Sequence, residues 1–373
     1  MLSHLFEPIR LRGLELTNRI IVAPMCQYSA IEGSMNDWHL MHLGQYAVSG
    51  AALVFVEATG VEAAGRITPG CTGLYSDANE AAMARVIKFF RDYGNARIGI
   101  QLGHAGRKGS AELPWDGGTP LASGDARGWQ TFGPSALPYS DSWPVPTALD
   151  VAGLERIKQG FVEAAKRSIR LGFDVIEIHC AHGYLLHQFL SPLSNQRGDA
   201  YGGSLENRLR FPLEIFEAVR AVCPDDLPVG VRVSATDWVE GGWDLDGTIS
   251  FTQALADLGC DFIDISSGGN SPDQQIIAGP GYQTGFAAAV RRATQITTIA
   301  VGQITDPFQA ETIVASGQAD MVALARGMLF EPRWPWHAAE ALGAEAAFPP
   351  QYRRSHPSLQ GEPIPGNPPS AKK

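Results

Sequence analysis

The sequence predicts an α/β fold, a single (β/α)₈ TIM barrel with an N-terminal hairpin, a long loop after the third strand and an extended C-terminal tail. Eight short runs of β-branched and other apolar residues recur along the chain, with helically spaced segments between them and after the last. The runs are apolar at almost every position, which is typical of parallel strands covered on both faces. The alternative is a doubly wound open sheet, but its GxGxxG fingerprint is missing after the first run.

Strand and helix alternate from residue 20 onward. The expected strands are residues 20–24, 52–57, 97–102, 175–179, 229–233, 261–265, 298–301 and 321–324. The expected helices are residues 39–49, 79–93, 151–171, 205–221, 248–258, 286–294, 307–316 and 334–342. Several of these helices end beside a glycine, such as Gly172, which is the usual residue after the end of a helix. Active sites of such barrels lie where the strands end, so the residues that follow each strand are the candidates for function.

Three segments lie outside this alternation. Residues 5–19 alternate apolar and polar positions around Arg12 and Gly13, which predicts a short hairpin that acts as a plug or a lid. Residues 103–150 show no sustained period, and a loop of that length is usually functional, here as a lid or a substrate-binding excursion. We assign residues 1–345 to the barrel. Residues 346–373 are expected to form an extended, proline-rich tail that reaches a neighbouring subunit in a homo-oligomer, either a dimer or a tetramer.

Composition excludes several classes of protein. With 373 residues, 45% hydrophobic and 18% charged, the chain is typical of a soluble globular protein, and no apolar run is long enough to span a membrane. The N-terminus does not have the pattern of a signal peptide. A net charge of −10 with scattered lysine and arginine argues against binding to nucleic acid or to an anionic membrane. Five dispersed cysteines without a CxxC pair argue against zinc ribbons and iron–sulfur clusters, and indicate free thiols in the cytoplasm.

The most informative stretch is residues 175–184, a buried strand followed by His179, His182 and Tyr184. The two histidines have three possible roles. They are zinc ligands, or structural histidines of the core, or a pair of donors for an anionic or carbonyl oxygen with Tyr184 as a proton source nearby. The fold favours the third role, because it places all three residues at the catalytic end of the barrel.

Other strand ends carry polar or small residues as well. Cys26 follows the first strand, and it is either a small buried residue or a functional thiol. Arg232 lies on the fifth strand, where it is either an internal ion-pair partner or a ligand-binding residue. Glycines follow the seventh and eighth strands, at Gly302 and Gly327, where they either cap helices or form the phosphate cradle that is common in this fold.

Four motifs in combination are highly specific. They are Pro24-Met25-Cys26-Gln27-Tyr28, Gln101-Leu102-Gly103-His104-Ala105-Gly106-Arg107-Lys108, His179-Cys180-Ala181-His182-Gly183-Tyr184-Leu185, and Phe189-Leu190-Ser191-Pro192-Leu193-Ser194-Asn195 with Tyr201-Gly202-Gly203-Ser204-Leu205-Glu206-Asn207-Arg208. From about Leu5 to Leu342, the chain resembles the old yellow enzyme family of flavin-dependent ene-reductases. Cys26 and Tyr28 make it similar to the bacterial subgroup of YqjM and xenobiotic reductase A.

This resemblance implies an enzyme of the NADPH dehydrogenase type that binds FMN non-covalently and oxidises NAD(P)H, with NADPH favoured. It implies reduction of the activated C=C bond of enones, enals, maleimides or nitroalkenes by hydride transfer from flavin N5 to the β-carbon. His179 and His182 are expected to bind the activating oxygen, and phenolic ligands in its place. Tyr184 is expected to protonate the α-carbon.

The resemblance also assigns the other site residues, and no metal. Residues expected to contact FMN are Ala23, Pro24, Met25, Cys26, Gly60, Gln101, His179, Arg232, Ser267, Gly302, Gln303, Ala325 and Arg326. Tyr28 is expected to assist at the substrate, as is Arg354 from a neighbouring subunit. The chain departs from the subgroup at Cys180, where a small residue is usual, and in a tail that continues beyond Arg354.

Two other functions are open. A reductase of the dienoyl-CoA type would need a cysteine-rich iron–sulfur module after the barrel, where this sequence has none. A flavin-binding or ligand-binding barrel without turnover would not need a proton donor, which the His179, His182 and Tyr184 set provides.

Overall fold

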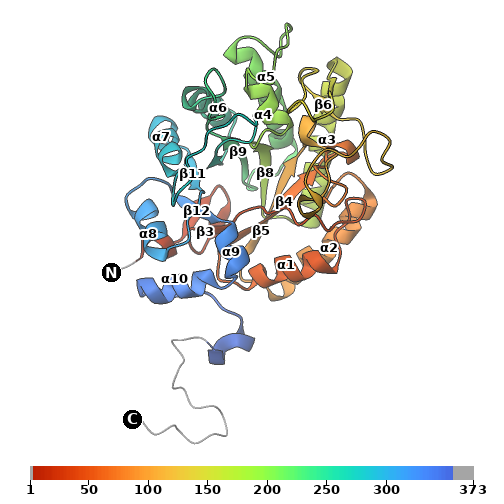
Figure 1. The fold of residues 1–373 in the computed structure, drawn as a ribbon. Helices are drawn as coiled ribbons and strands as arrows, with labels where there is room; N and C mark the ends of the chain where they lie inside the picture. Colours follow the sequence, from red (N-terminus) through yellow and green to blue (C-terminus); the bar gives the residue numbers. More distant parts are fainter. Residues whose placement is uncertain (1–2, 356–373) are drawn as a thin grey trace, which may run out of the picture.

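The structure, a computed structural model, describes residues 3–355, and they form a closed barrel of eight parallel strands surrounded by helices (Figure 1). The barrel strands are β3 (Ile20–Val22), β4 (Leu53–Gly60), β5 (Arg97–Gly103), β8 (Val175–Cys180), β9 (Val229–Ser234), β10 (Phe262–Ser266), β11 (Thr297–Ala300) and β12 (Met321–Leu324). Around the ring they are ordered β10-β11-β12-β3-β4-β5-β8-β9. The predicted fold class is confirmed, and each predicted strand overlaps an observed one.

Helices cover the outside of the barrel. They are α1 (Asp37–Ala47), α2 (Asp77–Tyr93), α3 (Val151–Leu171), α4 (Leu185–Leu190), α5 (Leu205–Val222), α6 (Leu245–Asp257), α7 (Thr284–Thr294), α8 (Pro307–Ala315), α9 (Arg326–Phe330) and α10 (Trp334–Leu342). The short helices α4 and α9 were not predicted. Several of the longer helices begin after a residue whose side chain accepts a backbone N–H of the first turn, such as Ser76 before α2 and Asp150 before α3. Among the described residues, no helix is long and apolar enough to cross a membrane.

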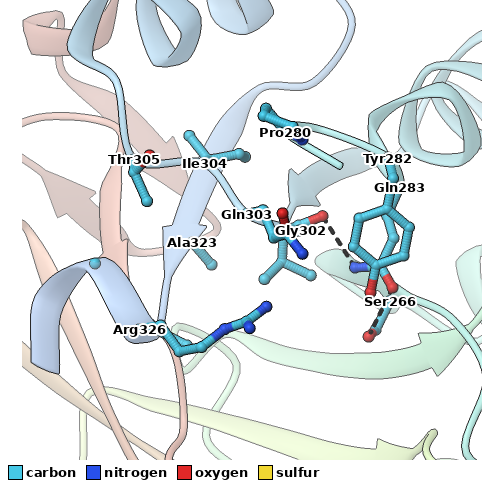
Figure 2. Close-up of a pocket in the computed structure, with 13 residues that line it drawn as sticks. Ser266, Pro280, Tyr282, Gln283, Gly302, Gln303, Ile304, Thr305, Ala323 and Arg326 are labelled. Carbon is cyan, nitrogen blue, oxygen red and sulfur yellow. Dashed lines mark hydrogen bonds between the residues drawn. The ribbon is translucent and has the colours of Figure 1, made fainter. Parts of the chain in front are cut away.

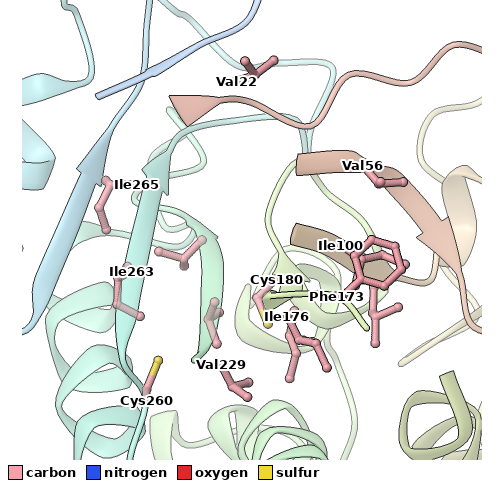
Figure 3. Close-up of a cluster of buried hydrophobic side chains, with 14 of the residues drawn as sticks. Val22, Val56, Ile100, Phe173, Ile176, Cys180, Val229, Cys260, Ile263 and Ile265 are labelled. Carbon is pink, nitrogen blue, oxygen red and sulfur yellow. The ribbon is translucent and has the colours of Figure 1, made fainter. Parts of the chain in front are cut away.

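The core has two parts, because successive strand residues face opposite sides of the sheet. Residues such as Val56, Ile176 and Ile263 face outward and pack against the helices (Figure 3). Phe55 and Phe262 face inward and fill the barrel. Parallel strands buried on both faces in this way explain the nearly continuous apolar runs of the sequence.

The N-terminal hairpin plugs the barrel. It is formed by β1 (Ile9–Leu11) and β2 (Leu14–Leu16), which are antiparallel, as predicted. Leu11 and Leu16 belong to the same buried cluster as the inward-facing barrel residues. Arg12 contacts Asp261, just before β10, with Nε 2.7 Å from Oδ1. The hairpin therefore closes the end where the strands begin and leaves the opposite end for the loops.

The loop after β5 contains short elements of its own. These are the 3₁₀ helices η3 (Gly106–Lys108) and η4 (Pro114–Asp116) and a small parallel pair, β6 (Phe132–Gly133) and β7 (Thr147–Ala148). Three further 3₁₀ helices are η1 (His4–Phe6), η2 (Ala63–Gly65) and η5 (Pro350–Ser355). Because η5 lies within the predicted tail, that stretch is helical and not extended as we expected. Residues 356–373, the rest of the predicted tail, lie outside the described residues.

Candidate active site

A buried polar layer lies inside the barrel near the ends of the strands. It consists of Gln101 on β5, Glu177 on β8, Arg232 on β9 and Asp264 on β10, and all four side chains are buried. Gln101 Nε2 donates to Glu177 Oε1 at 2.7 Å, and Arg232 Nε lies 3.2 Å from Asp264 Oδ2. The layer follows from strand alternation, because each of these residues is two positions away from another inward-facing residue.

The charges in this layer do not balance, since one guanidinium faces two carboxyl groups. Burial, followed by the negative charge of Asp264, raises the pKa of Glu177 to about 8. Burial also raises the pKa of Asp264, although Arg232 opposes that shift. Glu177 Oε2, Arg232 Nε and Asp264 Oδ1 are buried without a well-directed hydrogen bond. Buried donors and acceptors that lack a protein partner are suited to hydrogen-bond with the polar edge of a planar heterocycle.

A cavity of about 460 Å³ lies beside this layer, over the ends of β11 and β12. Its walls include Gly302, Gln303, Ala325 and Arg326, and Figure 2 shows the Arg326 side chain pointing toward Gln303. The described residues provide no hydrogen bond or ion pair for the Arg326 guanidinium. A cationic side chain beside glycine-bearing backbone is suited to binding a phosphate.

The segment after β3 lies at the same end of the barrel and carries Cys26 and Tyr28. Burial raises the pKa of the Cys26 thiol well above its usual value, with smaller contributions from Cys71 and Glu57, so Cys26 is neutral at pH 7. Glu57 is buried next to it, with Oε1 3.3 Å from His39 Nε2. The Tyr28 ring packs edge-on against Trp115 of η4, with ring centres 5.9 Å apart. The long loop therefore contacts the segment that carries Cys26 and Tyr28.

His179 and His182 lie side by side. The N–H of Ala181 donates to His179 Nδ1 at 3.1 Å, so a neutral His179 ring holds its proton on Nε2. That nitrogen lies 3.3 Å from His182 Nδ1, and His182 Nε2 lies 2.7 Å from Ser266 Oγ. Burial, then the charge of Arg232, lowers the pKa of both histidines well below the usual value. Both rings are therefore neutral hydrogen-bonding groups at pH 7.

Tyr184 completes this group. Its ring stands perpendicular to the His179 ring, at an interplanar angle of 89° with 5.1 Å between the ring centres. Burial raises the pKa of Tyr184 well above its usual value, so the phenol keeps its proton. Lys108 lies over the same ring, with Nζ 5.3 Å from the ring centre. The end of β8 therefore combines two neutral imidazoles with a protonated phenol.

Most of the predicted site residues come together at this end of the barrel. Ser267 is an exception in part, because its hydroxyl donates to Gln283 Oε1 at 2.6 Å, while its neighbour Ser266 lines the cavity. Arg354 is exposed on η5, which contributes no residue to the walls of this cavity. The described residues contain no group of three or more His, Cys, Asp or Glu side chains placed to hold a metal ion.

The sequence analysis missed Glu177, Asp264 and Lys108 as parts of the site. Glu177 and Asp264 had a signal that we did not use. Strand alternation places them on the inner face, two residues from His179 and from Ser266. Lys108 had no such signal, because its position depends on how the loop after β5 packs against the loops after β8 and β10.

Comparisons with known proteins agree with this site. Residues 4–345 match the model of the NADH:flavin oxidoreductase / NADH oxidase family. The chain belongs to this family. It is 42% identical over 352 residues to an NADPH dehydrogenase of Geobacillus thermodenitrificans, covering 94% of this chain and 98% of the relative. It is 43% identical over 360 residues to an NADH:flavin oxidoreductase of Gibberella zeae, covering 92% of this chain and 87% of the relative.

Two solved structures of reductases share the fold. Morphinone reductase matches with a TM-score of 0.76 and 28% identity, covering 92% of this chain and 91% of that one. A 2-naphthoyl-CoA reductase matches with a TM-score of 0.81 and 25% identity, and the chain spans 52% of its length. The resemblance to the old yellow enzymes is confirmed, and the protein is an FMN-dependent NAD(P)H oxidoreductase.

The residues of this structure fit FMN. The polar layer has buried atoms that lack well-directed partners, which suits the polar edge of the flavin ring. The cavity beside it places Arg326 and the backbone of Gly302 where a phosphate group is readily bound.

Proposed function

We propose that the protein reduces the activated C=C bond of small electron-poor alkenes such as enones, enals, maleimides and nitroalkenes. The observation that carries this proposal is the group of side chains at the end of β8. His179, His182 and Tyr184 converge there, at the same end of the barrel as the polar layer and the cavity that fit FMN. Binding alone does not require a protonated phenol next to two imidazoles. Bound FMN, after reduction by NAD(P)H, supplies the hydride that adds to the β-carbon of the alkene.

FMN is held by three sets of residues in this proposal. Ala23, Pro24, Met25, Cys26, Gly60 and His179 surround the ring. Gln101 and Arg232 bind its polar edge. Gly302, Gln303, Ala325 and Arg326 hold the phosphate, and Ser267 supports them through Gln283.

The histidines bind the activating oxygen of the substrate by exchanging hydrogen-bond partners. His179 Nε2 now faces His182 Nδ1, so only one proton lies between the two rings. An oxygen bound to both nitrogens needs a second proton, on His182 Nδ1. His182 supplies it by changing tautomer, after which its Nε2 accepts a hydrogen bond from the Ser266 hydroxyl. Two N–H groups then face the oxygen as negative charge develops on it, which lowers the barrier.

Tyr184 provides the proton that completes the reaction. The raised pKa of Tyr184 keeps the phenol protonated across the neutral range, so it is ready to donate. The proton goes to the α-carbon as hydride adds to the β-carbon, and the C=C bond becomes a single bond. Tyr28, in the segment after β3, contacts the substrate.

The activity test is spectroscopic. Purified protein loaded with FMN should lose its flavin absorbance under anaerobic conditions when NADPH is added, and should regain it on addition of 2-cyclohexenone. Protein that remains colourless after incubation with FMN contradicts the proposal. Flavin that NADPH bleaches but that none of a panel of enones, maleimides and nitroalkenes reoxidises contradicts the substrate class alone.

Replacing His179 and His182 together with alanine should weaken the binding of a phenol such as 4-nitrophenol by about a hundredfold or more. The reason is that hydrogen bonds to a charged acceptor typically contribute about 1.5–3 kcal/mol. Titration of the flavin absorbance with the phenol measures the affinity. His337→Ala, a change at an exposed histidine on α10, serves as the control. Unchanged phenol affinity in the double variant argues against these histidines as the oxygen site.

We also propose that the protein is a cytoplasmic homo-oligomer in which Arg354 reaches the active site of a neighbouring subunit. The exposed position of Arg354 on η5 is compatible with this role. Arg354→Ala should raise the KM for an acidic or carbonyl-bearing alkene several-fold without releasing FMN. Steady-state kinetics and flavin content measure the two effects, and an unchanged KM removes Arg354 from the site.

A further inference from the structure

A buried pair of side chains, a histidine and an aspartate, lies behind the turn that carries His182 and Tyr184. His187, on α4, and Asp237, after β9, have no exposed surface, and His187 Nε2 lies 2.9 Å from Asp237 Oδ1. The contact is bent and not a linear hydrogen bond, so we treat it as an electrostatic contact between a polarised N–H and a carboxylate. The pair is separate from the residues assigned above to FMN, to the substrate oxygen and to proton transfer.

The other ring nitrogen of His187 holds the turn. The N–H of Gly183 donates to His187 Nδ1 at 2.9 Å. Nδ1 therefore carries no proton, and the neutral ring holds its proton on Nε2, toward Asp237. Asp237 Oδ2 in turn accepts from Ser191 Oγ at 2.5 Å and from the N–H of Trp243 at 2.9 Å. The result is a chain from carboxylate to imidazole to the backbone N–H of Gly183.

The turn needs such support because its backbone is strained. His182 has φ of +59°, in the left-handed region that residues with a side chain rarely adopt, and Gly183 follows with φ of +72°. Gly183 also lies against the loop after β10, where an added Cβ would come within 2.2 Å of the Gly269 carbonyl oxygen. Backbone of this kind persists only where its surroundings impose it.

Side chains from other segments bind all four backbone polar groups of His182 and Gly183. The N–H of His182 donates to Ser234 Oγ at 2.9 Å, and its carbonyl accepts from Lys108 Nζ at 2.9 Å. The carbonyl of Gly183 accepts from Gln188 Nε2 at 2.7 Å. The fourth group, the N–H of Gly183, depends on His187. Of these four partners, His187 alone loses its function on gaining one proton, because a doubly protonated ring has no acceptor.

We propose that Asp237 and His187 are positioning residues for the reaction. Asp237 holds the His187 ring in the orientation and the tautomer that leave Nδ1 free to accept, and His187 thereby fixes the turn that directs His182 and Tyr184 at the substrate. This inference rests on the proposed function. Carboxylates that orient the histidines of metal sites act by the same physics, and their removal typically reduces affinity or activity by about 10–100-fold.

The same arrangement occurs at two other loops around the barrel mouth. His104 Nδ1 accepts the N–H of Gly106 at 3.0 Å, and its Nε2 lies 3.0 Å from Glu62 Oε1. His39 Nδ1 accepts the N–H of Asn36 at 3.1 Å, and its Nε2 faces Glu57. Three loops are thus anchored by a histidine whose Nδ1 accepts a backbone N–H and whose Nε2 faces a carboxylate. This recurrence indicates a shared means of holding the loops and not a chance contact at His187.

The test compares Asp237→Asn with Asp320→Asn in the FMN-loaded enzyme. Asp320 is a matched control, because it also accepts a backbone N–H, that of Thr298 at 2.9 Å, at the start of a strand on the opposite end of the barrel. Asp237→Asn is expected to weaken 4-nitrophenol binding by about tenfold or more and to raise the KM for 2-cyclohexenone, with normal FMN content. Asp320→Asn is expected to leave both values unchanged.

Three results are decisive. Wild-type enzyme that does not bind 4-nitrophenol overturns the proposed oxygen site, and this inference with it. Wild-type binding with equal affinities in the two variants overturns the role of Asp237 alone. If Asp237→Asn does not fold, ¹⁵N spectra of histidine-labelled wild-type enzyme decide, with the His187 signals assigned through His187→Asn. An unprotonated Nδ1 and a protonated Nε2 at His187 support the proposal, and any other protonation pattern overturns it.

Discussion

Replacing Tyr184 with phenylalanine is expected to slow the reduction of 2-cyclohexenone by about 10²- to 10⁴-fold, the usual contribution of a positioned general acid. Burial keeps the phenol protonated by raising its pKa, and the ring stands against His179, one of the two histidines proposed to bind the substrate oxygen. The substitution removes the transferable proton and leaves the ring in place. Flavin reduction by NADPH does not need that proton, so its rate should stay close to that of the wild type. Stopped-flow spectroscopy of the two half-reactions separates the two rates.

Tyr93→Phe provides the control for this experiment. Tyr93 is largely exposed at the end of α2, and its hydroxyl has no role in the site. Both half-reactions of this variant should proceed at the wild-type rate. If Tyr184→Phe slows both half-reactions equally, the residue shapes the site without donating the proton. If it slows neither, water or another side chain protonates the α-carbon.

The fold was predictable because its main signal is periodic. Strands buried on both faces and helices with one apolar side leave patterns that survive in a single sequence. The helix α4 shows where this fails. All six of its residues are buried, including the polar His187 and Gln188, so Leu185–Leu190 has no exposed side and thus no amphipathic period. α9 is too short, at five residues, for a period to be visible.

The site was predictable only in part, for a different reason. The barrel fold places the carboxyl end of every strand on one face, so the sequence alone predicts His179, Arg232 and Gly302 there. What the sequence does not encode locally is the packing of one loop on another. Lys108 contacts the carbonyls of His182 and Gly269, and Asp237, in the loop after β9, approaches His187 on α4. Those contacts exist only once the barrel is closed.

The tautomer of His182 also lies beyond sequence reasoning. Residue type and spacing indicate two imidazoles near one oxygen, which is the role we expected. The structure adds that the two rings contact each other and that His182 Nε2 lies 2.7 Å from Ser266 Oγ. The donor role of His182 therefore depends on a serine hydroxyl that can both accept and donate. That requirement is visible only in the arrangement of β8 against β10.

Replacing Arg232 with methionine is expected to destabilise the protein by about 3–5 kcal/mol, the usual result of removing one partner from a buried ion pair. Arg232 Nε lies 3.2 Å from Asp264 Oδ2, and its charge also opposes the rise in the pKa of Glu177. Methionine fills a similar volume but leaves the two buried carboxyl groups without a cation. Urea unfolding monitored by fluorescence measures the decrease in the free energy of unfolding. Arg210→Met, which removes an exposed pair with Glu206 on α5, should cost at most about 1 kcal/mol.

The companion variant Glu177→Gln tests which carboxyl group is ionised. Because the pKa of Glu177 is raised to about 8, the folded protein holds a proton there that the unfolded chain releases near pH 4.3. A raised pKa in the folded state means that stability falls as the pH rises from about 4.3 through about 8. Glutamine imitates the neutral acid, so this variant should be as stable as the wild type at pH 7. Between pH 7 and pH 8.5 its free energy of unfolding should fall less than that of the wild type. A large loss already at pH 7 would mean that Glu177 is ionised and that Arg232 balances it, leaving Asp264 as the protonated group.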